Sequence, residues 1–272
     1  MSPVTTPGSA AEPSATVTAS MLEVRDVTLN FGGVMALSEI SLSVAGGALQ
    51  AIIGPNGAGK TSLFNCLTGY YRPSSGSIIY GGTVLDGLAP PDIAALGIRR
   101  TFQNIRVFPR MTVQENVLAG AHLRAVAGLP AILAGSPGWR RTERLLRDDA
   151  DRWIEFVGLA DQRRRTAGDL AYGMRKRMEI ARAMIGQPGL LLLDEPAAGV
   201  SSVEREALSD LIARVHAQGV GVVMIEHDVE LVMNLATNVC VLDGGRLLAS
   251  GPPEAVRSNP DVIRAYMGRR RK

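Results

Sequence analysis

A glycine-rich run near the start of the chain carries the clearest chemistry in the sequence. Residues 54–61 read Gly-Pro-Asn-Gly-Ala-Gly-Lys-Thr, a spacing that lets the backbone curl with its N–H groups around a phosphate chain. The lysine can reach the β- and γ-phosphates, and the threonine hydroxyl can ligate Mg²⁺. An apolar run precedes the loop and a helix start follows it, as a phosphate-binding loop requires. The predicted nucleotide-binding residues are Gly54, Pro55, Asn56, Gly57, Ala58, Gly59, Lys60, Thr61 and Ser62.

Two later apolar runs end in residues that suit phosphate hydrolysis. Residues 190–193 are four leucines followed by Asp194 and Glu195, which is typical of a central strand in a parallel sheet. The carboxyl end of such a strand lies beside the phosphate loop, where Asp194 can hold Mg²⁺ and Glu195 can orient or deprotonate a water. The alternative is an acid pair that only caps the next helix. Residues 220–225 form another buried strand that ends at His227, which can hydrogen-bond a γ-phosphate.

An aromatic residue ends the first predicted strand. Residues 22–31 partly alternate between apolar and polar, and Phe31 stands beside Gly32-Gly33. Its ring can stack on a nucleotide base, or it can be an ordinary aromatic residue at a strand end. The sequence leaves both interpretations open.

Composition bounds the class of protein. The chain has 272 residues with 46% hydrophobic residues, enough for a substantial core, and its net charge of +3 does not indicate nucleic acid as a partner. Cys66 and Cys240 lack metal-ligand spacing and are expected to be buried thiols of a reducing compartment. No apolar run approaches the length of a membrane span, and residues 1–20 lack the features of a secretory signal. We therefore expect a disordered tail over 1–20 and a cytoplasmic protein.

The remaining patterns predict an α/β core with an antiparallel β part and a helical insertion. Hairpins are expected around Gly81-Gly82 and Asp243-Gly244, and a strand over 41–44. Predicted helical features are 93–97, a capping box from Thr112 to Glu115, 142–157, and an apolar stripe of Met174, Met178, Ala181 and Ile185. Residues 129–138 are expected to form a loop, and the basic residues 175–177 are expected to lie on a solvated helix face. His122 and His216 are expected to be ordinary surface or packing residues of helices. Residues 252–268 are expected to form a short helical tail, and 269–272 a solvated end.

The order of these motifs resembles the ATP-binding cassette (ABC) family over about residues 21–250. The resemblance implies a P-loop NTPase (RecA-like) core with an antiparallel β subdomain and a helical insertion. It also implies that Gln103 contacts Mg²⁺ and the attacking water and senses a membrane partner. Leu170 to Met174, with Ala171, Tyr172 and Gly173, matches the signature motif, which in the family closes on the ATP of the opposite subunit. Phe31 falls where the family's base-stacking aromatic residue lies.

Three positions depart from the general family pattern. Ala171 lacks the hydroxyl and Met174 lacks the amide of the usual signature, so only backbone N–H groups and the helix N-terminus remain for phosphate. Ser201 stands where the general D-loop, the segment after the catalytic glutamate, carries an aspartate.

A narrower resemblance is to the ATPase subunits of branched-chain amino acid importers. Residues 100–106, 170–173, 194–199, 225–228 and 251–266 carry it, and Ala171-Tyr172 is the usual signature variant of that subfamily. The resemblance implies ATP and Mg²⁺ as cofactors, and a second ATPase subunit and two integral-membrane permease subunits as partners. It further implies indirect contact with an extracytoplasmic substrate-binding protein and a location at the cytoplasmic face of the membrane. Related importers carry urea, short amides or other amino acids, and a soluble ABC protein of translation or DNA repair is a further alternative.

The same reasoning divides the chain into five parts. These are the tail over 1–20, a first core part over 21–103, a helical subdomain over 104–185, a second core part over 186–250 and a C-terminal helical tail over 251–272.

Overall fold

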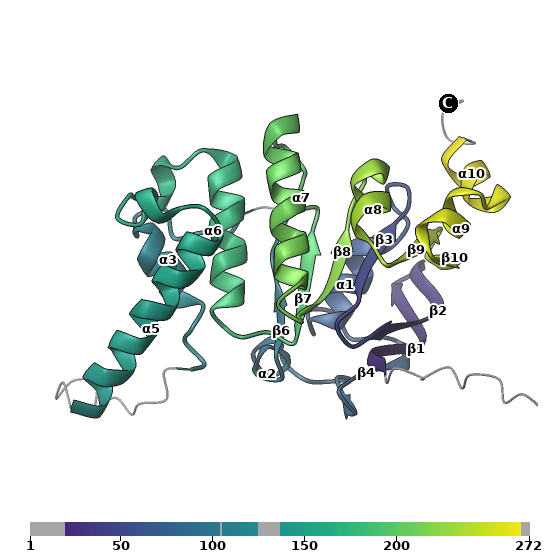
Figure 1. Cartoon of the computed structure of the whole chain (residues 1–272). Coiled ribbons are helices and arrows are strands. Elements are labelled where there is room, and N and C mark those ends of the chain that lie inside the picture. Colours follow the sequence, from purple (N-terminus) through teal and green to yellow (C-terminus); the bar gives the residue numbers. More distant parts are fainter. Residues whose placement is uncertain (1–19, 104, 125–136, 268–272) are drawn as a thin grey trace, which may run out of the picture.

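Two β-sheets organise the molecule (Figure 1). The computed structural model describes residues 20–103, 105–124 and 137–267. The larger sheet has the strand order β10-β9-β3-β8-β7-β6. Its strands are β3 Leu49–Ile53, β6 Ile98–Arg100, β7 Leu190–Asp194, β8 Gly221–Ile225, β9 Asn238–Asp243 and β10 Arg246–Gly251. All neighbouring pairs from β9 to β6 are parallel, and β10 pairs with β9 antiparallel.

The smaller sheet is antiparallel and has the order β2-β1-β4-β5. Its strands are β1 Ser20–Phe31, β2 Val34–Ala45, β4 Ser75–Tyr80 and β5 Thr83–Val84. The predicted hairpin at Gly81-Gly82 is confirmed, with both glycines at positive φ. The strand expected over 41–44 is much longer, because all of β2 pairs with β1.

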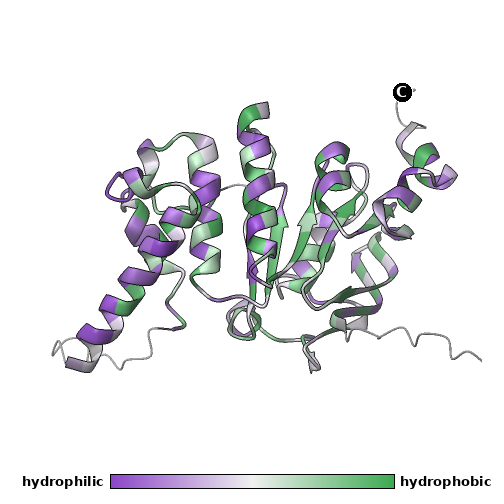
Figure 2. Cartoon of the chain, viewed as in Figure 1, coloured by the Kyte–Doolittle hydropathy of each residue, from purple (hydrophilic) through white to green (hydrophobic). Residues whose placement is uncertain are grey.

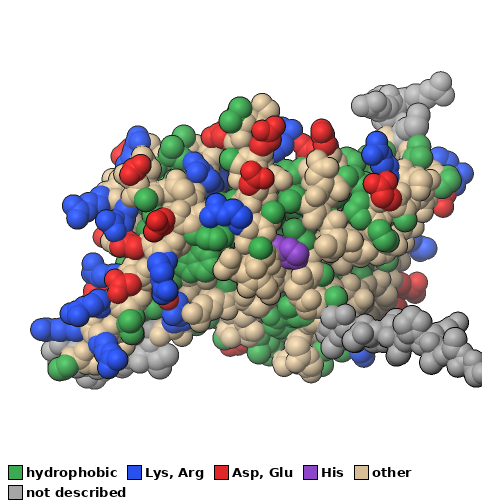
Figure 3. All heavy atoms as spheres, viewed as in Figure 1, with side chains coloured by type: hydrophobic (Ala, Val, Ile, Leu, Met, Phe, Trp, Pro, Cys, Tyr) green, Lys and Arg blue, Asp and Glu red, His purple; other side chains and the backbone are tan. Residues whose placement is uncertain are grey.

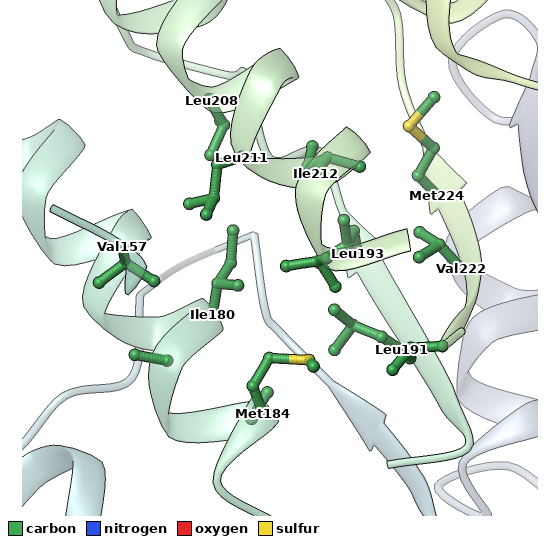
Figure 4. Packing of buried hydrophobic residues seen from close by; sticks show 14 of the residues in the cluster. Val157, Ile180, Met184, Leu191, Leu193, Leu208, Leu211, Ile212, Val222 and Met224 are labelled. Atoms are coloured by element: carbon green, nitrogen blue, oxygen red, sulfur yellow. The ribbon is translucent and has the colours of Figure 1, made fainter. Parts of the chain in front are cut away.

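Successive side chains of the large sheet point to its opposite faces and belong to two separate hydrophobic cores. Leu191, Leu193, Val222 and Met224 pack with α6 Tyr172–Met184 and α7 Ser202–His216, as Figure 4 shows. Leu190, Leu192 and Val223 face the other way, toward α1 Lys60–Leu67 and the small sheet. A sheet buried on both faces needs strands that are apolar throughout, which is how β7 and β8 appear in Figure 2.

The chain between β6 and β7 is mainly helical and lies beside the large sheet (Figure 1). Its elements are α3 Val113–Ala119, α5 Pro137–Phe156, the short 3₁₀ turns Ala160–Gln162 and Ala167–Asp169, and α6. The remaining helices are α2 Pro90–Ala95, α8 Val229–Leu235, α9 Pro253–Arg257 and α10 Pro260–Met267. On the face drawn in Figure 3, lysine and arginine side chains gather mainly over this helical part. The division of the chain into five parts remains our proposal.

Several sequence expectations are met and others need correction. The capping box at Thr112 is present, and both cysteines are buried. β6 was not expected, because a three-residue strand is too short to show a pattern. Helix α5 begins at Pro137, inside the stretch expected to be a loop, since proline is accepted in a first helical turn. Of the tail expected over 1–20, residues 1–19 lie outside the described residues, and Ser20 already belongs to β1. Most of the loop over 129–138 and the end over 269–272 also lie outside the described residues.

No helix among the described residues is long and apolar enough to cross a membrane.

Candidate active site

The glycine-rich loop joins β3 to α1 in a conformation that only glycine fits at two points. A Cβ on Gly54, which has a φ of +151°, would lie 2.1 Å from the Leu242 carbonyl oxygen. A Cβ on Gly59, at φ +98°, would lie 2.7 Å from the Ala36 carbonyl oxygen. The backbones of β9 and β2 therefore lie too close to the loop for a side chain at these positions. Residues 54–59 form the predicted loop, and Thr61 and Ser62 follow Lys60 in the first turn of α1.

Lys60 is buried and its ammonium group turns back over the loop. Its Nζ donates to the carbonyl oxygens of Gly54 at 2.7 Å and Pro55 at 3.0 Å. Burial lowers the pKa of Lys60, while the charges of Glu195 and Asp194 oppose that shift. The cation is thus placed inside the loop and near both carboxylates, as contact with a bound phosphate requires.

Glu195, Gln103 and His227 meet at the carboxyl ends of three neighbouring parallel strands, β7, β6 and β8. Gln103 Nε2 donates to Glu195 Oε2 at 2.9 Å, and His227 Nε2 lies 2.8 Å from Glu195 Oε1. An ionised carboxylate only accepts, so the imidazole bonds through a protonated Nε2. The carboxylate retains lone pairs for a water molecule, which makes it a suitable base. The structure therefore brings these predicted residues together.

Asp194 is buried beside an arginine that the sequence reasoning did not assign to the site. Arg100 donates to Asp194 Oδ2 at 2.6 Å, and its other terminal nitrogen bonds Asn65 and Thr68 of α1 and its C-cap. Asp194 Oδ1 is buried without a hydrogen-bond partner. An anionic oxygen in that state suits a hard cation or a water bound to one.

No group of three or more His, Cys, Asp and Glu residues that could hold a metal occurs in residues 20–103, 105–124 and 137–267.

Comparison with known proteins decides the family. The family model described as ABC transporter matches residues 37–198, more than half of the chain. The chain belongs to the ABC transporter family. It is an ATP-binding cassette and an ATPase. A second model, described as branched-chain amino acid ATP-binding cassette transporter, matches residues 246–272 of the cassette.

Curated relatives match the cassette over nearly their whole length. A protein named high-affinity branched-chain amino acid transport ATP-binding protein BraF, from Pseudomonas aeruginosa, is 45% identical over 91% of the cassette and 98% of its own length. The protein of the same description named LivG, from Escherichia coli, is 43% identical with the same coverage.

Among solved structures, two cassettes of ABC transporters are similar throughout. One in an ADP conformation has a TM-score of 0.80 and 30% identity, covering 92% of this chain and 100% of its own. A nucleotide-free one has a TM-score of 0.79 and 29% identity, covering 91% and 99%.

The signature residues of the cassette lie at the start of α6. Ala171 is the N-cap and makes no side-chain capping bond, and both Ala171 and Tyr172 are exposed. A Cβ on Gly173 would lie 2.4 Å from Glu204 Oε1, and one on Gly199 would lie 3.3 Å from the Tyr172 ring. The signature thus lies against the turn after β7 and the start of α7.

Phe31 of the cassette is 46% exposed at the end of β1. Its ring meets the edge of the Tyr71 ring at a centroid distance of 5.0 Å. Base stacking requires an exposed aromatic ring, and the exposure of Phe31 is compatible with it. The stacking interpretation stays a prediction.

A further sequence expectation, on the basic residues of α6, is wrong. Residues 175–177 were expected to form a solvated face, but Lys176 is only 4% exposed. Its Nζ donates to the Glu195 carbonyl oxygen at 2.7 Å. The apolar stripe of α6 could not reveal this, because the partner lies beyond the helix, on the turn after β7.

Proposed function

We propose that the chain is the ATP-hydrolysing subunit of an ABC importer that takes up branched-chain amino acids through separate permease subunits. The observation that carries this proposal is the match of residues 246–272 to the branched-chain amino acid model, in a chain whose relatives at 43–45% identity bear that transport name. The alternative substrates, urea and short amides, become outcomes of the transport test.

Each site residue has a role under this proposal. Lys60 and the loop N–H groups would bind the phosphates, Phe31 would stack on the base, and Thr61, Asp194 and Gln103 would hold Mg²⁺. The ion would neutralise charge on the β- and γ-phosphates. Gln103 and His227 keep the Glu195 carboxylate in place from two sides, at 2.9 and 2.8 Å. Glu195 then orients the attacking water and accepts its proton.

The proposal also specifies the assembly. Two cassettes close on two ATP molecules, and the signature residues Ala171, Tyr172 and Gly173 of each bind the nucleotide held by the other. Two permease subunits hold this pair at the cytoplasmic face of the membrane, and an extracytoplasmic binding protein delivers the substrate. The position of the signature at an exposed helix start supports this arrangement.

A groove beside the segment after Gln103 is our proposed permease contact. It runs between β6, α3 and α6, and its lining includes Arg99, Phe108, Gly120 and Arg182. Phe108 is 52% exposed, whereas Val107 packs against the core. Buried Asn116 accepts from the Phe108 N–H at 2.8 Å and donates to its carbonyl oxygen at 3.0 Å. The backbone is thereby fixed so that the ring stays at the surface.

The test is Phe108→Asp in the transporter reconstituted in vesicles with its permeases. We expect the variant subunit to fold and bind ATP normally, because the ring lies outside the core. Permease-stimulated hydrolysis and uptake of leucine, isoleucine and valine should be lost, since a charge replaces the apolar contact. Leu145→Asp is the matched control, because Leu145 is an exposed apolar residue of α5 outside the groove.

Normal stimulated hydrolysis by Phe108→Asp would place the permease contact elsewhere. A wild-type complex that transports urea or amides but no branched-chain amino acid would keep the importer assignment and overturn its substrate.

A further inference from the structure

Lys176 links the helix that begins with the signature to the backbone of Glu195. The residue lies in the second turn of α6, and its Nζ donates to the Glu195 carbonyl oxygen at 2.7 Å. The ammonium group also lies 5.5 Å from the centre of the Tyr172 ring. Burial lowers its pKa, and the nearby carboxylates, with Glu226 the strongest, favour the charged form. Burying a cation costs free energy unless the cation is paired and hydrogen-bonded. A buried ammonium group beside the candidate base therefore indicates a specific role.

The backbone that receives this bond is in an unusual conformation. Glu195 has a φ of +49°, in the left-handed region that residues with a Cβ rarely adopt. Such a residue persists only where its surroundings hold it. Its N–H donates to the Ile225 carbonyl oxygen at 3.0 Å, and its own carbonyl accepts from Ala198 at 3.1 Å as well as from Lys176. Of these contacts, the Lys176 bond is made by a side chain.

The same side of α6 also holds the segment that carries Gln103. Glu179, three residues after Lys176, is buried, which raises its pKa, while Arg182 and the backbone groups of Phe102 and Arg106 act in the opposite direction. Arg182, three residues further on, pairs with Glu179 at 3.3 Å and donates to the Arg106 carbonyl oxygen. Helix α6 is therefore bonded both to the Glu195 backbone and to Arg106, three residues after Gln103. Figure 4 shows that helix packed beside β7 through Ile180 and Met184.

We propose that Lys176 is a positioning residue for hydrolysis, which holds Glu195 from α6 while Arg182 of that helix, paired with Glu179, holds the backbone at Arg106, just after Gln103. A rigid α6 then moves the signature residues and both water-orienting groups as one unit. This inference rests on the proposed role of Glu195 as the base.

The test compares Lys176→Met, Lys176→Arg and wild-type full-length chain with MgATP. Methionine keeps the length and apolar stem of lysine and removes the donor. We expect the Kd for a fluorescent ATP analogue to stay within about 2-fold, while kcat falls by about 10- to 100-fold, as a misplaced catalytic group produces. Arginine keeps a cation and N–H donors, and should recover most of the lost kcat.

Arg177→Met is the matched control. Arg177 lies next in α6 and also donates to backbone carbonyl oxygens, those of Val157 at 3.2 Å and Gly158 at 3.4 Å, away from Glu195. We expect its kcat to equal that of the wild type. If Lys176→Met alone fails to show a cooperative melting transition, the double variant Lys176→Met/Glu226→Gln replaces it, because it removes one buried charge of each sign. Its kcat is then compared with that of Glu226→Gln alone.

Three results would overturn the inference while leaving the proposed function intact. They are a wild-type kcat in Lys176→Met, an equal loss in Arg177→Met, or a rise in KM without a fall in kcat. Glu195→Gln, measured alongside, should be inactive with normal ATP affinity in each case. A wild-type chain that binds no MgATP would instead overturn the proposed function, and this inference with it.

Discussion

Glu195 receives hydrogen bonds from three separate parts of the chain. Gln103 follows β6, His227 follows β8, and Lys176 reaches over from α6. Each bond acts on a different part of Glu195, two on the carboxylate and one on the backbone. A single residue is thus held at both ends, which is the preorganisation that proton transfer from a water requires.

Phe31 provides the test at the residue scale. The exposed ring can offer only a stacking face, which favours substrate and transition state equally. Phe31→Ala should therefore raise KM for ATP by about 5-fold or more and leave kcat within about 2-fold, given ~1 kcal/mol for a stacked base. Steady-state hydrolysis at varied ATP measures both constants, and Tyr71→Ala serves as the control for the neighbouring ring. An unchanged KM would remove Phe31 from the nucleotide site.

At the scale of elements, the serine at the D-loop position has a structural role at the start of α7. Ser201 is the N-cap of α7, and its hydroxyl accepts from the Glu204 N–H at 3.3 Å. Glu204 Oε2 in turn accepts from the Ser201 N–H at 3.1 Å, which completes a capping box. The same glutamate lies against Gly173, so the cap also fixes the contact between α7 and the signature. Serine here satisfies a local requirement of the helix.

Ser201→Ala should destabilise the chain by about 1 kcal/mol, because it removes the capping acceptor. The melting temperature should fall by about 2–4 °C for a chain of this size. Differential scanning calorimetry measures the change, and Ser202→Ala, one residue later on the exposed helix surface, should leave it unchanged. Ser201→Asp should melt like the wild type, since aspartate caps as well as serine does. Equal melting of Ser201→Ala and the wild type would exclude the capping role.

At the scale of the molecule, the residues proposed to bind and hydrolyse the nucleotide fall into two separate groups. The phosphate loop and the side chains of Gln103, Glu195 and His227 lie at the strand ends of the large sheet, while the signature lies at the start of α6 against α7. Under the proposed function, the missing part of each site comes from a second cassette.

Glu195→Gln tests this arrangement. Glutamine keeps the shape of the side chain and removes the base, so the variant should bind ATP and accumulate as an ATP-bound dimer. Light scattering with MgATP, alone and with the permeases, measures the mass. Glu195→Gln/Lys60→Ala, which also lacks the phosphate cation, should remain monomeric. A Glu195→Gln variant that stays monomeric under all these conditions would count against the paired arrangement.

The sequence by itself determined those features whose physical cause is local. The phosphate loop was predictable because Gly54 and Gly59 must adopt positive φ between a strand and a helix. The strands β7 and β8 were predictable because both faces are buried, so no polar residue interrupts them. The placement of Glu195 and His227 in one crevice followed from the rule that parallel strands present their carboxyl ends together.

Only the tertiary structure decided which charges are buried and with whom they pair. Arg100 and Asp194 are 94 residues apart, and Lys176 and Glu195 are 19 apart, so no periodicity relates either pair. On a helical pattern Lys176 is indistinguishable from a solvated lysine, since its burial depends on the turn after β7 that packs against α6. Strand β6 likewise exists because its three residues pair with β7, not because its own sequence favours a strand. Such contacts are set by how distant segments pack, and that information is absent from any local window of the chain.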